Sequence, residues 1–67
     1  MKNFLKEYRT KTNLTQKQVA TLCEISERQY IRYEVSYQVP TVNIALRLAR
    51  VLGTTVEELF PLEGEDV

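Results

Sequence analysis

Hydrophobic residues recur three and four positions apart along most of this chain, which is the spacing of helices with one buried face. Phe4, Leu5 and Tyr8 show it first, before a polar break at Thr12-Asn13. No segment shows the alternation typical of a strand. The pattern therefore predicts an all-α fold of five short helices. They are expected within residues 3–11, 15–23, 26–34, 42–52 and 55–60.

The predicted helix starts carry capping signals. Three of them place a Gln or Glu three positions after a hydroxyl residue, so the hydroxyl can accept a backbone N–H while the longer side chain reaches back. Thr41 is expected to cap the fourth helix, and Gly53 to end it, as glycine does at helix C-termini. The three expected capping boxes are Thr15 with Gln18, Ser26 with Gln29, and Thr55 with Glu58.

The helical period also predicts which side chains face inward. In the third helix, burial of Tyr30 and Tyr33 turns Arg28 and Arg32 outward, because successive residues are rotated by about 100°. Leu22 should point outward from the second helix. The inward positions of the second and fourth helices are predicted to be Val19, Ala20, Cys23, Ala45, Leu46, Leu48, Ala49 and Leu52.

The second and third helices are separated by only a few residues, Cys23-Glu24-Ile25. A turn of this length makes two helices cross steeply instead of lying antiparallel, which is the helix-turn-helix arrangement. The third helix would be apolar on one side and polar, with two arginines, on the other. Such an element suits the major groove of DNA.

The charges are unevenly distributed, although the net charge is zero. Residues 1–50 hold all nine Lys and Arg against four acids, whereas residues 51–67 hold five acids and no base. We expect one domain over residues 1–62 and an acidic tail over residues 63–67. A basic body permits phosphate contact on one face, and the alternative is a neutral domain with a solubilising tail.

The residue types present argue against several other functions. The chain has no histidine, one cysteine, no glycine-rich phosphate loop and no clustered metal ligands. We therefore expect no enzyme, no cofactor and no metal, and no small-molecule ligand is evident. The single Cys23 suggests a reducing compartment and is expected to be a buried, inert thiol. No apolar run approaches the ~18 residues of a membrane span, so we expect a cytoplasmic protein with no membrane partner.

The order of the five segments resembles the Cro/C1-type, or XRE, family of helix-turn-helix regulators. LKEYRTKTNLTQKQVATLCEISERQYIRYE is followed by PTVNIALRLARVLG and TVEELF, and the resemblance covers roughly residues 4–60. It implies a lambda-repressor-like DNA-binding domain. Glu24 and Ser36 depart from it because both positions commonly hold glycine, and Tyr30 replaces an aliphatic residue. A left-handed backbone at Glu24 would cost about 1 kcal/mol unless the turn relaxes.

The resemblance also implies roles on the third helix, whose first, second and sixth residues face base edges in this family. Arg28 and Arg32 would bind guanine O6 and N7, and Glu27 would accept from cytosine N4. Ile31 offers an apolar contact for a thymine methyl group. The alternative is that Glu27 and Arg28 are only a solvated helix start, with Glu27 favouring the helix dipole.

Phosphate contacts are expected at two places. Gln16, with Lys17 adding charge, would contact the DNA backbone at the start of the second helix. Gln29 would serve either as a phosphate contact or, as favoured, as the capping-box partner of Ser26. The expected contacts beyond the third helix, for which plain surface is the alternative, are Tyr37, Gln38, Thr41 and Asn43.

Two further sets of residues are expected to hold the assembly together. Arg9 and Glu34 resemble a family pair that joins the first helix to the third. Small members of the family pair through the last helix and its flanks, which implies a homodimer. The residues expected at that interface are Val56, Phe60, Pro61 and Leu62, and their alternative role is closing the core over the first helix.

We therefore expect a sequence-specific regulator, a repressor, that binds double-stranded DNA as a homodimer on a near-palindromic operator. The alternative is a protein-interaction or antitoxin-like module with the same fold and little intrinsic DNA reading. Near-neutral net charge and exposed Leu22, Ile31 and Val35 favour the alternative. Arg28 and Arg32 on the outward face favour DNA.

Overall fold

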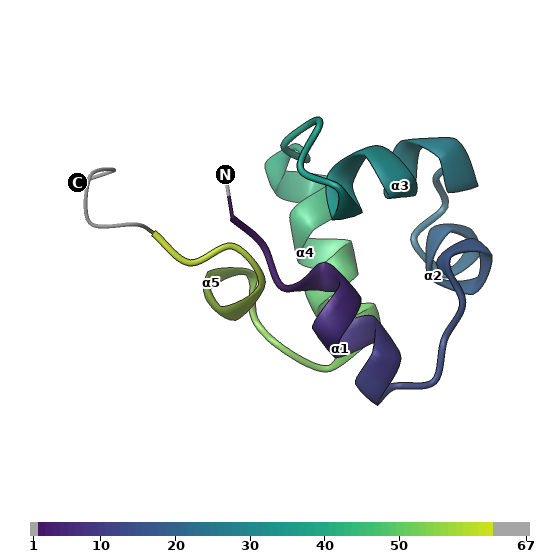
Figure 1. The fold of residues 1–67 in the computed structure, drawn as a ribbon, viewed down its shortest axis with the longest axis horizontal. Coiled ribbons are helices and arrows are strands. Elements are labelled where there is room, and N and C mark those ends of the chain that lie inside the picture. The colour runs from purple at the N-terminus through teal and green to yellow at the C-terminus, as the bar shows by residue number, and fades with distance from the viewer. Residues whose placement is uncertain (1, 63–67) are drawn as a thin grey trace.

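The computed structural model describes residues 2–62 and contains five α-helices (Figure 1). No strand occurs in these residues, so the predicted all-α fold is confirmed. The predicted tail at residues 63–67 lies outside the described residues. The helices are α1 (Leu5–Lys11), α2 (Gln16–Leu22), α3 (Glu27–Glu34), α4 (Val42–Leu52) and α5 (Val56–Leu59).

The two helices of the predicted helix-turn-helix form one end of the molecule. α2 packs against α3, and Figure 1 shows them at the right, with α3 along the upper edge. α1 contacts α3, and α2 contacts α4, so this helix pair rests on two other helices. α5 packs on α4 at the opposite side.

One hydrophobic core joins all five helices. Tyr30 is the largest of the fully buried side chains, and Cys23 is completely buried, as predicted. Burial also raises the pKa of the Cys23 thiol, which keeps it protonated and unreactive. The buried core cluster consists of Leu5, Val19, Ala20, Cys23, Tyr30, Tyr33, Leu48, Ala49, Leu52 and Leu59.

Leu46 was predicted to be inward, and this prediction is wrong. Its side chain is 55% exposed, whereas Ala45 and Leu48 are buried. Ala45 and Leu48 share the stripe that repeats every three and four residues, but Leu46 is rotated by about 100° from Ala45. Leu22 is 58% exposed, which confirms that it points outward.

The capping signals are confirmed at the first of the three expected boxes. The Thr15 hydroxyl accepts from the Gln18 backbone N–H at 3.0 Å, and the Gln18 side chain accepts from the Thr15 N–H at 2.8 Å. Thr55 accepts from the Glu58 backbone N–H at 3.1 Å, but the return contact is different. The Glu58 carboxylate accepts from the Thr55 hydroxyl at 3.4 Å and from the Tyr8 hydroxyl at 3.0 Å. The expected box at Thr55 is therefore only half formed.

The two turns that flank α3 each contain a residue in the left-handed backbone conformation that glycine adopts most readily. Glu24 has φ 61° and Ser36 has φ 65°, both in the left-handed region. The turns do not relax around these residues, since the Ile25 N–H bonds the Ala20 carbonyl at 3.0 Å and the Tyr37 N–H bonds the Arg32 carbonyl at 2.8 Å. Each non-glycine residue there costs about 1 kcal/mol. The helix-turn-helix geometry is thus maintained against local strain.

Candidate nucleic-acid interface

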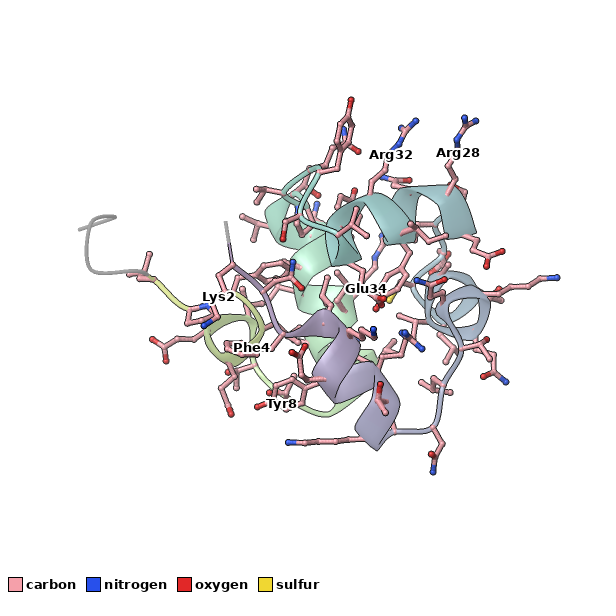
Figure 2. All side chains as sticks on the ribbon, viewed as in Figure 1. Lys2, Phe4, Tyr8, Arg28, Arg32 and Glu34 are labelled. Atoms are coloured by element: carbon pink, nitrogen blue, oxygen red, sulfur yellow. The ribbon has the colours of Figure 1, made fainter. Side chains whose placement is uncertain are left out.

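The outer face of α3 carries charged side chains that project away from the molecule. Figure 2 shows Arg28 and Arg32 extending from α3 in nearly the same direction. Both residues are exposed, as is Glu27 at the start of the helix. Ile31 is partly buried, and Val35, one turn later, is 64% exposed. The four residues predicted for base contact therefore lie on one helix, with three of them fully open to solvent.

The opposite face of α3 is fixed in the core by two tyrosines. Tyr30 is 0% exposed and Tyr33 is 4% exposed. Because these positions lie three apart, they occupy one side of the helix and leave Arg28 and Arg32 on the other. The helix cannot rotate about its axis without exposing an aromatic ring, so the direction of both arginines is set by the core.

The carboxylate of Glu34, at the end of α3, accepts hydrogen bonds from three other residues. Arg9 donates from Nε to Oε2 at 2.8 Å and from Nη2 to Oε1 at 3.2 Å, which confirms the predicted ion pair. The Tyr30 hydroxyl donates to Oε2 at 2.6 Å, and Gln16 Nε2 donates to Oε1 at 3.1 Å. Arg9 also donates to the Leu14 carbonyl at 3.0 Å. We call Arg9, Gln16, Tyr30 and Glu34 the Glu34 network.

The Glu34 network keeps its carboxylate charged although the side chain is only 6% exposed. Burial alone would raise the pKa of Glu34, but the hydrogen bonds from Arg9, Tyr30 and Gln16 outweigh it and leave the pKa below its ordinary value. The same hydrogen bond to Glu34 raises the pKa of Arg9. Burial, followed by the bond to Glu34, raises the pKa of Tyr30. The network is therefore a stable ionic contact between α1, α2 and α3.

Gln29 was predicted to complete a capping box with Ser26, and this prediction is wrong. The Ser26 hydroxyl accepts from the Gln29 backbone N–H at 3.1 Å, so the helix start is capped. The Gln29 side chain does not return to Ser26. Its Nε2 donates instead to the Tyr33 hydroxyl at 2.6 Å, one turn along the helix. Tyr33 is buried, and its hydroxyl attracts the amide because a buried polar atom needs a partner.

The residues expected to contact phosphate have different surroundings. Lys17 is exposed at the start of α2, but Gln16 beside it is partly buried and bonded to Glu34. An amide nitrogen carries two hydrogens, so Gln16 keeps one donor for another partner. The Thr41 hydroxyl caps α4, accepting from the Ile44 N–H at 3.4 Å.

The connector between α3 and α4 folds back onto the end of α3. The backbone N–H groups of Tyr37 and Gln38 both donate to the Arg32 carbonyl, at 2.8 and 3.1 Å. Tyr37, Gln38, Thr41 and Asn43 are all exposed. The structure therefore brings these predicted contact residues to the C-terminal side of α3.

Asn3 is a residue of this region that sequence reasoning missed. Its Nδ2 donates to the Tyr33 carbonyl at 3.0 Å and to Ser36 Oγ at 2.9 Å, and its Oδ1 accepts from the Leu5 N–H at 3.0 Å. The last contact resembles a helix cap, and an Asn two positions before a helix is the signal that was available. The contacts to Tyr33 and Ser36 join residues 30 and 33 positions apart, so no local pattern indicated them.

The residues predicted for a dimer interface lie around α5. Val56 and Phe60 are partly buried against the core, Pro61 is partly buried, and Leu62 is 69% exposed. Val56 and Phe60 also border an apolar groove of about 230 Å³ between α5 and the start of α4. The groove is lined by Val39, Pro40, Val42, Ala45, Val56 and Phe60.

Two other kinds of site are absent from the part of the chain that the structure describes. No cluster of His, Cys, Asp or Glu there could hold a metal ion. None of its helices has the length and apolar character of a membrane span.

Comparisons with known proteins agree with this geometry. The profile of the helix-turn-helix family matches residues 5–59. An uncharacterised HTH-type transcriptional regulator of Methanocaldococcus jannaschii is 33% identical over 66 residues, covering 98% of this chain and all of the relative. Another, from Archaeoglobus fulgidus, is 27% identical over 67 residues, covering all of this chain and 94% of the relative.

A solved structure has the same fold. A chain of a SinR protein/SinI protein complex superposes with a TM-score of 0.80 at 19% identity and covers 94% of this chain. The present chain spans 62% of the length of that chain. The likeness establishes the five-helix architecture, and the sequence matches establish the kinship. The chain belongs to the Cro/C1-type helix-turn-helix family, whose curated members here are HTH-type transcriptional regulators.

Proposed function

We propose that this DNA-binding regulator is a sequence-specific repressor, which inserts α3 into the major groove of a near-palindromic operator. One observation carries the proposal: Arg28 and Arg32 project from α3 with no ion pair to any described residue. Because the opposite face of α3 is packed into the core, both guanidinium groups stay directed outward with their N–H donors available. Such an arrangement suits a ligand that supplies acceptors.

The chemistry of base recognition follows from the side chains on this face. The guanidinium groups of Arg28 and Arg32 match guanine O6 and N7, each contact being worth about 1–3 kcal/mol of discrimination. Glu27 would accept from cytosine N4, and the exposed part of Ile31 would contact a thymine methyl group. The Glu34 network supports this role because it braces the helix that presents these groups.

Backbone contacts would fix the register of α3 in the groove without reading sequence. Gln29 is kept on the same ground as Gln16, because its amide nitrogen has a second hydrogen beside the one bonded to the Tyr33 hydroxyl. The proposed contacts comprise Gln16, Lys17, Gln29, Tyr37, Gln38, Thr41 and Asn43.

A homodimer would read two half-sites about 34 Å apart, one turn of the DNA helix. We place the contact between copies on the α5 side, at Val56, Phe60, Pro61 and Leu62. Exposure of Leu62 and the apolar groove beside Phe60 support this placement. Bound to an operator in the cytoplasm, the dimer would repress by occupying the site.

A second candidate is a module that binds another protein. Exposed Val39, Val42 and Leu46 favour it, since apolar side chains on the connector and α4 suit a protein surface better than they suit phosphate. The SinR chain of similar fold is found in a complex with SinI protein, so this fold occurs with a protein partner. DNA remains the better candidate because the arginines of α3 face away from the core.

Duplex binding at two salt concentrations tests the proposal. We expect random duplex to be bound at about 50 mM salt, with affinity at least about tenfold lower at 200 mM, because phosphate contacts release counterions. Duplexes selected from a random pool should share a half-site, and Arg28→Ala should reduce the base preference at one base pair of it. Absence of duplex binding at low salt would rule out the proposed function and favour the protein-binding module.

A further inference from the structure

Gln16 is connected to α3 more directly than a backbone contact alone requires. It is the first residue of α2, yet its side chain is bonded to Glu34 at the end of α3. Lys17, the exposed residue next to it, has no hydrogen bond to the Glu34 network. Of two neighbouring residues that would both face phosphate, only Gln16 is thus bonded to α3.

The Glu34 carboxylate has little freedom to give up this contact. It accepts four hydrogen bonds, two from Arg9 and one each from Tyr30 and Gln16, at distances between 2.6 and 3.2 Å. The side chain is 6% exposed, so water does not readily replace a lost donor. Gln16 is therefore held by a carboxylate that is itself held from two other directions.

The position of Glu34 decides which part of α3 this contact fixes. Glu34 is two residues from Arg32 and six from Arg28. The N-terminal turn of α3, with Arg28, is held by the Ser26 cap. The C-terminal turn, with Arg32, is held by Glu34 and by the connector that bonds to the Arg32 carbonyl. A shift of Glu34 itself would therefore move Arg32 more than Arg28.

We propose that Glu34 is a positioning residue that locks Gln16 to the C-terminal half of α3, so that Gln16 contributes to base discrimination and not only to backbone contact. This inference rests on the proposed function. When phosphate fixes the position of Gln16, the hydrogen bond from Gln16 to Glu34 also fixes the position of the turn that carries Arg32. Affinity for the backbone and discrimination by Arg32 are then coupled, whereas Lys17 supplies affinity alone.

The test compares Gln16→Ala with the matched control Lys17→Ala. Two base pairs of the selected operator are first identified: the Arg32 base pair, at which Arg32→Ala loses discrimination, and the Arg28 base pair, at which Arg28→Ala loses it. Affinities are then measured for the operator duplex and for duplexes changed at each of these base pairs. Lys17→Ala should weaken all duplexes by the same factor. Gln16→Ala should in addition lower discrimination at the Arg32 base pair by about 2- to 30-fold, with a smaller loss at the Arg28 base pair.

A second measurement needs no DNA and separates positioning from general damage to the fold. Nuclear magnetic resonance titration of the Glu34 carboxyl should show a higher pKa in Gln16→Ala than in the unmodified protein, and no change in Lys17→Ala. Tyr30→Phe, which keeps the ring and loses one donor to Glu34, should also lower discrimination at the Arg32 base pair. If Glu34→Gln folds, it should also lower discrimination at the Arg32 base pair. If it does not fold, Tyr30→Phe alone tests the role of the network.

The outcomes distinguish the inference from the function on which it rests. If the unmodified protein binds no duplex, both are wrong. If it binds and Gln16→Ala lowers all affinities by one factor, as Lys17→Ala does, the proposed function stands and the coupling is wrong. An unchanged pKa of Glu34 in Gln16→Ala would also overturn the coupling.

Discussion

The two ends of this molecule are held together by different forces. At the α2–α3 end, one buried carboxylate joins three helices through charged hydrogen bonds. At the α4–α5 end, apolar side chains pack together and leave Val39, Val42 and Leu62 more than 60% exposed. Charged hydrogen bonds are directional and fix an angle, whereas apolar contact is tolerant of rearrangement. The first end suits a task that needs a fixed geometry, and the second suits association with another apolar surface.

Arg9→Ala should have the largest effect, because it removes the charge that compensates buried Glu34. We expect the free energy of unfolding to fall by about 3 kcal/mol, measured by urea denaturation followed by circular dichroism. The control Lys6→Ala, on the same helix but exposed, should change stability by less than about 0.5 kcal/mol. Equal effects from the two variants would show that the α2–α3 end does not depend on its ionic network.

Leu62→Asp examines the other end. The side chain is 69% exposed, so the charge should leave the folding of one copy nearly unchanged. If Leu62 lies between two copies, burying an aspartate there should weaken their association by about tenfold or more, as measured by sedimentation equilibrium. Leu22→Asp is the matched control, because Leu22 is 58% exposed on α2, away from α5. Association that is unaffected by Leu62→Asp would place the interface elsewhere.

Acid should weaken the α2–α3 end selectively. The pKa of Glu34 is lowered in the folded protein, so its contribution to stability is complete above the ordinary glutamate pKa of 4.5. That contribution is lost as the pH falls through the lower folded value. Thermal melts between pH 6 and pH 3 should show a loss of stability that is smaller in Glu34→Gln. The same acid dependence in both proteins would assign it to other carboxylates.

The fold was predictable because its signals are local. Capping residues, helical spacing and Gly53 each act within a few positions, and all five helices follow from them. Leu46 was misplaced because hydrophobicity was given more weight than its angle on α4. The correct helix predictions and the error at Leu46 both depend on the geometry of a single helix.

The site was less predictable because side chains compete for partners across the molecule. The pair Arg9–Glu34 came from family resemblance, but the attachment of Gln16 to the same carboxylate depends on how α2 crosses α3. Gln29 was expected either to accept from the Ser26 N–H or to contact phosphate, but its Nε2 donates to the buried Tyr33 hydroxyl instead. Spacing along the chain places Gln29 beside Tyr33 on α3, but it does not show which partner the amide takes, and it does not indicate the contact between Gln16 and Glu34.

The anchoring of Asn3 has a practical consequence for work with this protein. Asn3 connects the segment ahead of α1 to the Tyr33 carbonyl and to Ser36, where α3 ends. A fluorophore attached just ahead of Asn3 would therefore sit beside the α3–α4 connector. It would report on ligand arrival there, whereas an affinity tag at the same position risks crowding that surface.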